Sequence, residues 1–151
     1  MRSYDALIHE MSELIDIPLK LGERGQVVIE VDGTLVIHLE HLIQSNEIRI
    51  ATLLITLPPD VVRERVLEST LRANSLPSAS QGTFAFSSKR SALVLFKQWP
   101  VELLNGEMLC DILEEFILKG KEWIFALEEG RTEPIGFHQR QGDTPGGLFG
   151  L

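Results

Sequence analysis

Two histidines, His38 and His41, are the residues best placed for metal chemistry, since they flank Glu40 in the stretch HLEH. Imidazole and carboxylate groups are common zinc ligands. The stretch alternates apolar and polar residues like a β-strand, in which residues i and i+2 share a face and residue i+3 does not. The two histidines therefore point to opposite faces, and no Cys or Asp cluster supplies further ligands. The pattern favours a solvent-facing strand end, and we predict no metal or cofactor.

Nucleophilic chemistry has one obvious candidate, the single cysteine Cys110, near the start of a predicted helix. A helix N-terminus can lower the pKa of a thiol. No nucleophile signature surrounds Cys110, however, and a lone cysteine is usually a small packed hydrophobe. The serines lie in predicted loops without a G-x-S-x-G elbow, and GERGQ precedes a strand, so no phosphate cradle is indicated. We predict a binding protein with no catalytic residues; a small hydrolase or transferase using Cys110 or His38 is the alternative.

The charge balance narrows the class of partner. The chain has 14 Lys and Arg against 22 Asp and Glu, a net charge of −8. Duplex nucleic acid and anionic lipid both need a basic surface, so neither is expected as the main partner. A single cysteine suits a reducing compartment, residues 1–20 lack the pattern of a signal peptide, and no apolar run is long enough to span a membrane. The sequence predicts a soluble cytoplasmic protein.

The first half of the chain reads as a helix followed by three strands. Apolar residues from Tyr4 to Ile15 recur at helical spacing, with Ser3 placed as a cap and Pro18 beyond the end. Residues 27–39 alternate around Asp32-Gly33, a strong signal for a hairpin with a type I′ turn. Residues 47–57 form a third strand whose end is apolar on both faces, which predicts a central, covered position.

The second half contains a helix, two strands and a long helix. Pro58-Pro59 precedes the first helix, "GTFAF" and "SALVLFKQ" read as strands, and apolar residues line one face over 105–128. The order α-β-β-β-α-β-β-α predicts an α+β fold, with a twisted antiparallel sheet flanked by helices. Residues 1–129 form the predicted domain. Residues 130–151 hold 6 of the 12 glycines and no apolar period, so we predict a flexible tail.

The helix after Pro58-Pro59 carries two apolar stripes instead of one. Val62, Val66 and Ala73 fall on one line, whereas Leu67 and Leu71 fall more than a quarter-turn away. The first stripe is expected to cover the sheet of its own subunit. The second predicts either contact with another subunit or a helix buried on two sides within one subunit.

The order of these motifs resembles a known family. A D-G hairpin follows the first helix, a strand runs into Leu57-Pro58, the next helix ends in "LRAN", and "GTFAF" and "FILKGKEW" follow. Over residues 1–129 the chain resembles the class I type III secretion chaperones, the Tir-chaperone or CesT/SycE-like group. The resemblance implies a bacterial cytoplasmic homodimer without cofactors. It also implies that the protein binds the non-globular N-terminal segment of a secreted effector, keeps it secretion-competent and delivers it to the export apparatus, with the export ATPase or sorting apparatus as a further partner. A YbjN-like acidic binding domain is the alternative.

The resemblance also assigns surfaces. It places the two-striped helix at the dimer interface, with these residues in contact with the partner subunit: Leu67, Leu71, Arg63, Thr70, Phe84 and Phe86. Without catalytic groups, a chaperone must gain affinity from apolar patches and open sheet edges. The end of the first helix and the outward face of the hairpin are the natural effector-binding surface, which predicts roles for Leu14, Ile15, Val28 and Val36; the alternative is that these residues complete the core.

Overall fold

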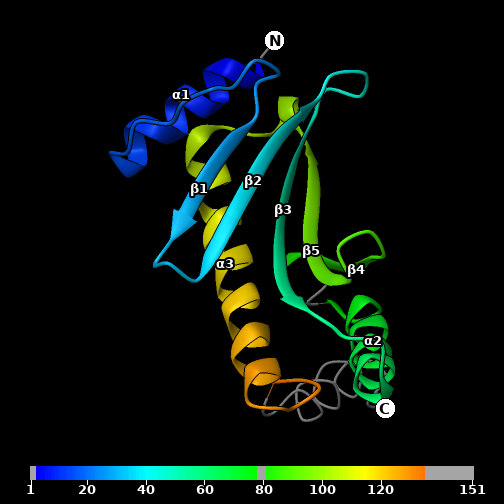
Figure 1. The fold of residues 1–151 in the computed structure, drawn as a ribbon. Helices are drawn as coiled ribbons and strands as arrows, with labels where there is room; N and C mark the ends of the chain where they lie inside the picture. The colour runs from blue at the N-terminus through cyan, green and yellow to red at the C-terminus, as the bar shows by residue number, and fades with distance from the viewer. Residues whose placement is uncertain (1–2, 78–80, 135–151) are drawn as a thin grey trace, which may run out of the picture.

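The computed structural model describes residues 3–77 and 81–134, and it contains all the predicted elements (Figure 1). In chain order these are α1 (Tyr4–Ile15), β1 (Val27–Val31), β2 (Leu35–Leu42), β3 (Glu47–Thr56), α2 (Val61–Asn74), β4 (Thr83–Ser87), β5 (Ala92–Pro100), the short 3-10 turn η2 (Val101–Leu103) and α3 (Gly106–Glu128). The predicted α+β order is confirmed.

The five strands form one antiparallel sheet in the order β1-β2-β3-β5-β4. β3 is the central strand, as predicted, and a register shift between Leu53 and Ile55 bends it where it approaches α2. Two strands lie at the edges: β1, which pairs only with β2 over its described length, and the short β4, which pairs with the first part of β5.

The helices α1 and α3 cover one face of the sheet, and the core lies between these helices and the sheet (Figure 1). The largest fully buried side chains come from all these layers: Tyr4, Leu7, Ile8, Met11, Leu35, Ile37, Leu39, Ile48, Ile50, Leu93, Leu95 and Phe116. Among the described residues no helix covers the opposite face. Leu53 on the central strand is 40% exposed there, so the prediction that this strand is covered on both faces is wrong for the single chain.

Local signals explain the element boundaries. The Ser3 hydroxyl accepts a hydrogen bond from the Ala6 N–H at the start of α1, as a helix cap does. Asp32 and Gly33 both have positive φ, and the Thr34 N–H donates to the Val31 carbonyl, which fits the predicted type I′ turn. These two predicted boundaries therefore each have a hydrogen bond or a backbone conformation that explains them.

The start of α3 is fixed by a contact with α1. The Asn105 side chain caps the helix by accepting from the Met108 N–H, and the Glu10 carboxylate of α1 accepts from the Gly106 N–H at 3.0 Å. A Cβ at position 106 would lie 2.9 Å from the Glu10 Cβ, so only glycine permits this close approach. The two helices are thus joined at a helix N-terminus, where a carboxylate is favourable.

The chain after α3 turns back toward α2. Gly130 has a φ of +82°, as expected for a residue that ends a helix, and the Ser69 hydroxyl of α2 donates to the Glu133 carboxylate. The first residues of the predicted tail, 130–134, are therefore in contact with the body. Residues 135–151 lie outside the described residues. No helix in the described part of the chain is long and apolar enough to cross a membrane.

Candidate functional site

A groove of about 540 Å³ runs beside the edge strand β1. One wall is β1 itself and the other is the loop that joins α1 to β1; the lining residues are Ile17, Pro18, Leu19, Lys20, Leu21, Gly22, Gln26, Val28, Ile29 and Glu30. Most of this lining is apolar, with Lys20 and Glu30 supplying one charge of each sign. The groove therefore combines a strand edge with an apolar floor.

The outer wall of the groove is held in place by hydrogen bonds that cross the loop. The Ser12 hydroxyl of α1 donates to the Ile17 carbonyl and accepts from the Leu19 N–H. Farther along, the Gly22 N–H donates to the Gln26 carbonyl at 2.8 Å, and the Tyr4 hydroxyl donates to the Gly25 carbonyl at 2.7 Å. The loop is thus tied to α1 at both ends, which keeps the groove open before any partner binds.

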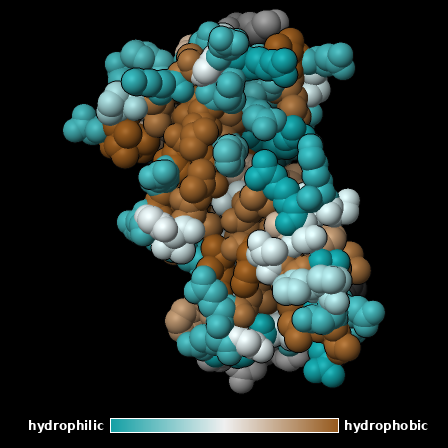
Figure 2. All heavy atoms as spheres, in the orientation of Figure 1, coloured by the Kyte–Doolittle hydropathy of each residue, from teal (hydrophilic) through white to brown (hydrophobic). Residues whose placement is uncertain are grey.

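The predicted binding residues fall into two places. Val28 is 54% exposed and lines the groove, and Val36 is exposed on the same outward face of the neighbouring strand. Leu14 is also exposed but lines a separate hollow between α1 and the start of α3, and Ile15 is half-buried. Figure 2 shows apolar atoms gathered on the uncovered face of the sheet, in a band that continues toward α2.

A strand edge with exposed apolar side chains beside it has a defined chemistry. The outward N–H and C=O groups of β1 have no strand partner among the described residues, since β1 pairs with β2 alone. Such an edge accepts an extended peptide as an added strand, and alternate side chains of that peptide would enter the apolar groove. The site can therefore hold a peptide in an extended conformation, and this requires no catalytic group.

The second surface is the exposed side of α2. Leu71 is 69% exposed and Leu67 is half-buried, so the second stripe of the helix does face outward. The first stripe needs correction: Val66 and Ala73 are buried, but Val62 is 53% exposed. Two polar residues of the helix, Ser69 and Thr70, are also buried. The buried side chains of the helix therefore lie from Val66 onward, whereas Val61 and Val62 in its first turn are exposed.

Polar side chains connect α2 to the residue that follows β3 and to β4. The Arg63 guanidinium donates to the Leu57 carbonyl through Nε at 3.0 Å and also through a second nitrogen, and it lies over the Phe86 ring with 4.7 Å to its centroid. At the other end of α2, the Asn74 amide bonds both backbone groups of Phe84. These contacts make α2 and β4 one unit with an outward apolar face.

Two of the predicted interface residues have almost no solvent-exposed surface. Thr70 and Phe84 are buried within the chain: the Thr70 hydroxyl donates to the Leu67 carbonyl, and the Phe84 ring packs against Trp123. Leu67, Leu71, Arg63 and Phe86 retain exposed area. The surface available to a partner subunit is therefore smaller than the predicted set of residues.

The candidates for chemistry have structural roles. His41 stacks on Tyr4 with 4.6 Å between ring centroids and bonds Asn46, while His38 is exposed on the other face, as the strand spacing predicts. No three His, Cys, Asp or Glu residues in the described part of the chain could hold a metal ion together.

The surroundings of Cys110 do not favour an activated thiol. Burial raises its pKa, and the charges of Asp111 and Glu107 raise it further. Cys110 packs against the core as a small hydrophobe.

The sequence profile of the Tir chaperone protein (CesT) family matches residues 6–124, which is well over half of the chain. The chain belongs to this family. The predicted resemblance to type III secretion chaperones is confirmed, and the comparisons give no support to the YbjN-like alternative. No curated protein matches this Tir-chaperone-family protein in sequence.

Solved structures agree on the fold. A chain of the HopA1-SchA chaperone-effector complex aligns with a TM-score of 0.69 and 18% identity, covering 82% of this chain and 94% of that one. The Yersinia pestis type III secretion chaperone SycH complex gives 0.64 and 19%, covering 78% and 97%. The ExoT-SpcS complex from Pseudomonas aeruginosa gives 0.62 and 18%, covering 79% and 95%. At these identities the likeness shows a shared fold.

Sequence reasoning missed the loop that walls the groove. Ile17, Leu19 and Leu21 alternate between the first helix and the first strand, and they belong to neither element. Exposed apolar residues in a connecting loop indicate a binding surface, because exposing apolar side chains to water is unfavourable for a loop that binds no partner. That alternation was the clue to the site.

Proposed function

We propose that this protein is a type III secretion chaperone that binds the non-globular N-terminal segment of a secreted effector, keeps it secretion-competent and delivers it to the export apparatus. The observation that carries the proposal is the groove beside β1, which joins an unpaired strand edge to an apolar floor containing Val28. Family membership supports the chaperone role, and neighbours of the same fold occur in complexes described as chaperone-effector complexes.

Binding follows from the shape of the groove. An extended effector segment would add to the edge of β1, place alternate side chains against the apolar floor and continue across Val36 on the uncovered face. A disordered segment loses conformational entropy when it binds, so the affinity must come from many shallow contacts. The preformed loop between α1 and β1 lowers the ordering cost on the chaperone side. Strand addition of this kind would keep the bound effector segment extended.

Assembly as a homodimer through the exposed side of α2 completes the proposal. Leu71 and Leu67, with Arg63 and Phe86 beside them, form an apolar stripe that one subunit leaves uncovered. A two-fold axis through this stripe would bury each leucine against its symmetry mate and the exposed first turn of α2 with it. The protein acts in the cytoplasm, by binding alone and without a catalytic step.

Secretion in the native bacterium tests the function. Deleting the gene should remove one or a few proteins from the set secreted through the type III system, while their synthesis continues. Expression of the wild-type protein should restore them. If the secreted set is unchanged by the deletion, the protein is not an export chaperone.

A further inference from the structure

The solvent face of α3 carries a regular stripe that the proposed function does not use. At 3.6 residues per turn, seven exposed positions fall within about 40° of one line along the helix: Glu107, Asp111, Glu114, Leu118, Glu122, Phe125 and Glu129. The opposite face of the helix supplies the core with Leu109, Phe116 and Trp123. The stripe is therefore free of any role in packing α3 on the sheet.

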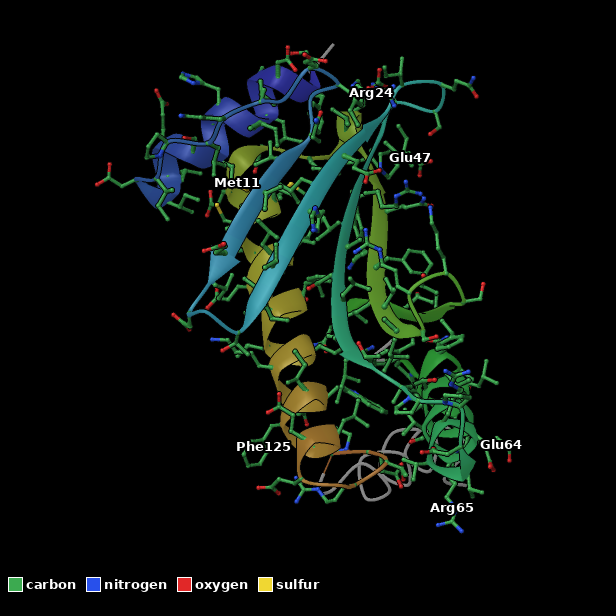
Figure 3. The ribbon with its side chains drawn as sticks, in the orientation of Figure 1. Met11, Arg24, Glu47, Glu64, Arg65 and Phe125 are labelled. Atoms are coloured by element: carbon green, nitrogen blue, oxygen red, sulfur yellow. The ribbon has the colours of Figure 1, made fainter. Side chains whose placement is uncertain are left out.

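Two large apolar side chains stand in this acidic stripe. Leu118 is 63% exposed and Phe125 is 59% exposed, seven residues apart, which places them about 10 Å apart along the axis. Figure 3 shows Phe125 pointing away from the body of the molecule and away from α2. Single exposed apolar residues are ordinary, but two on one helical line make the spacing of a helix-binding surface.

Acidic residues outnumber basic ones around these two side chains, although the Arg131 guanidinium lies over the Phe125 ring. Carboxylates precede, separate and follow them, at Glu114, Glu122 and Glu129. Of the two lysines beside them on α3, Lys119 is buried, and Lys121 is ion-paired with Asp32 at 2.5 Å. The net charge of the face is therefore negative, which favours a cationic partner.

The helix dipole adds to this preference. The last turn of α3 contains no basic residue, and Glu128 and Glu129 stand at the end of the helix, where the dipole is negative. Carboxylates there are unfavourable, and a cation brought by a partner would be favourable. The chain itself shows the contact: the Arg131 guanidinium pairs with Glu129 at 2.8 Å and lies 5.7 Å from the centroid of the Phe125 ring.

We propose that this face of α3 binds a basic amphipathic helix of another protein, with two apolar residues about two turns apart set against Leu118 and Phe125 and its Lys or Arg residues against the flanking carboxylates. A second copy of this chain does not fit, since a two-fold contact would set the acidic stripe against itself. The surface lies on a different element from the β1 groove and the α2 stripe. The inference is therefore independent of the proposed function.

Equilibrium binding of a designed peptide tests the proposal. The probe is a fluorescent amphipathic helix about five turns long, with leucine on one face and lysine on the other, measured by anisotropy. The variant Leu118→Gln with Phe125→Gln keeps the net charge, so non-specific attraction between the acidic protein and the peptide is unchanged. The matched control is Leu103→Gln with Met108→Gln, which removes two other exposed apolar side chains near the start of α3.

The proposal expects the Leu118/Phe125 variant to bind the peptide at least tenfold more weakly than the wild type, the control to bind like the wild type, and a peptide with glutamate in place of lysine not to bind. Equal affinity of both variants would overturn it. Loss of effector binding by the Leu118/Phe125 variant would assign the face to the effector instead. A change in particle mass in light scattering would assign it to a second copy, and either result would also overturn the proposal.

Discussion

The side chain of Asn74, the last residue of α2, bonds both backbone groups of Phe84 in β4. Its Nδ2 donates to the Phe84 carbonyl at 3.0 Å, and its Oδ1 accepts from the Phe84 N–H at 2.8 Å. The amide thus takes the place of a neighbouring strand at the edge of the sheet. This contact explains why the motif "LRAN" ends in asparagine, since only a carboxamide carries a donor and an acceptor in this arrangement.

The first prediction concerns this contact. Asn74→Ala leaves both backbone groups of a buried residue without their partner, so we expect the free energy of unfolding to fall by about 1–3 kcal/mol. Asn74→Asp keeps the acceptor and loses the donor, and it should give an intermediate value. Urea unfolding measures both. A loss below a few tenths of a kcal/mol in Asn74→Ala would show that the two hydrogen bonds contribute little.

The second prediction concerns assembly. Replacing Leu67 and Leu71 with Glu should convert a dimer into a monomer. Each buried leucine contributes about 1.5–3 kcal/mol, and the new carboxylates would face their symmetry mates. Light scattering gives the mass. The matched control is Leu103→Glu, at an exposed leucine far along the chain from α2, which should stay dimeric. A double variant with the mass of a dimer would contradict the α2 interface.

Much of the fold could be predicted because its signals are local. Ser3 and Asn105 cap helices from adjacent positions, and Asp32-Gly33 sets its own turn. The groove could not be predicted, because its wall depends on contacts such as the hydrogen bond from Tyr4 to the Gly25 carbonyl, 21 residues away. The sequence does not show which distant groups a loop will meet.

The division of α2 into an inner and an outer side was also only partly predictable. Helical periodicity separates two stripes, but it does not show where along its length a helix leaves the sheet, so Val62 was assigned to the wrong side. The error at Val62 comes from its tertiary surroundings. By contrast, the prediction that Cys110 packs as a small hydrophobe is confirmed, since Cys110 contacts the core and burial with two nearby carboxylates raises its pKa.

The third prediction concerns pH. Lys119 is buried and donates to the Gly82 carbonyl at 2.8 Å. Its pKa is lowered from 10.5 to about 8, mainly by burial, with the charge of Glu122 opposing the shift and that of Lys97 adding to it. Between about pH 8 and 10.5 the unfolded chain therefore keeps a proton at Lys119 that the folded chain has lost. Stability gains a contribution that grows with pH across this window.

Lys119→Met removes that contribution, so the free energy of unfolding of the wild type minus that of the variant should increase from pH 8 toward pH 10.5. Urea unfolding at several pH values, at one protein concentration, measures the difference. A difference that stays level across the window would mean that Lys119 titrates alike in the folded and unfolded chains.

The fourth prediction concerns the end of the chain. Because residues 136–151 lack a periodic apolar face, their deletion should leave the thermal midpoint essentially unchanged. The comparison variant ends after residue 129, and it should be less stable, since it loses the contact of Glu133 with Ser69 and of Arg131 with Phe125. Calorimetry of the two truncated proteins shows whether residues 130–135 contribute to the stability of the domain. A drop of many degrees in the shorter deletion would show that "LFGL" packs on the body.

The central claim is that an extended effector segment lies in the groove beside β1. The most direct test is the affinity of the N-terminal fragment of the secreted protein that depends on this chaperone, measured by calorimetric titration against Val28→Asp. The control is Ile43→Asp, at an exposed apolar residue in the turn between β2 and β3, outside the groove. We predict that Val28→Asp binds at least tenfold more weakly while its thermal midpoint and mass stay those of the wild type, and that Ile43→Asp binds normally. Wild-type affinity in Val28→Asp would contradict the account.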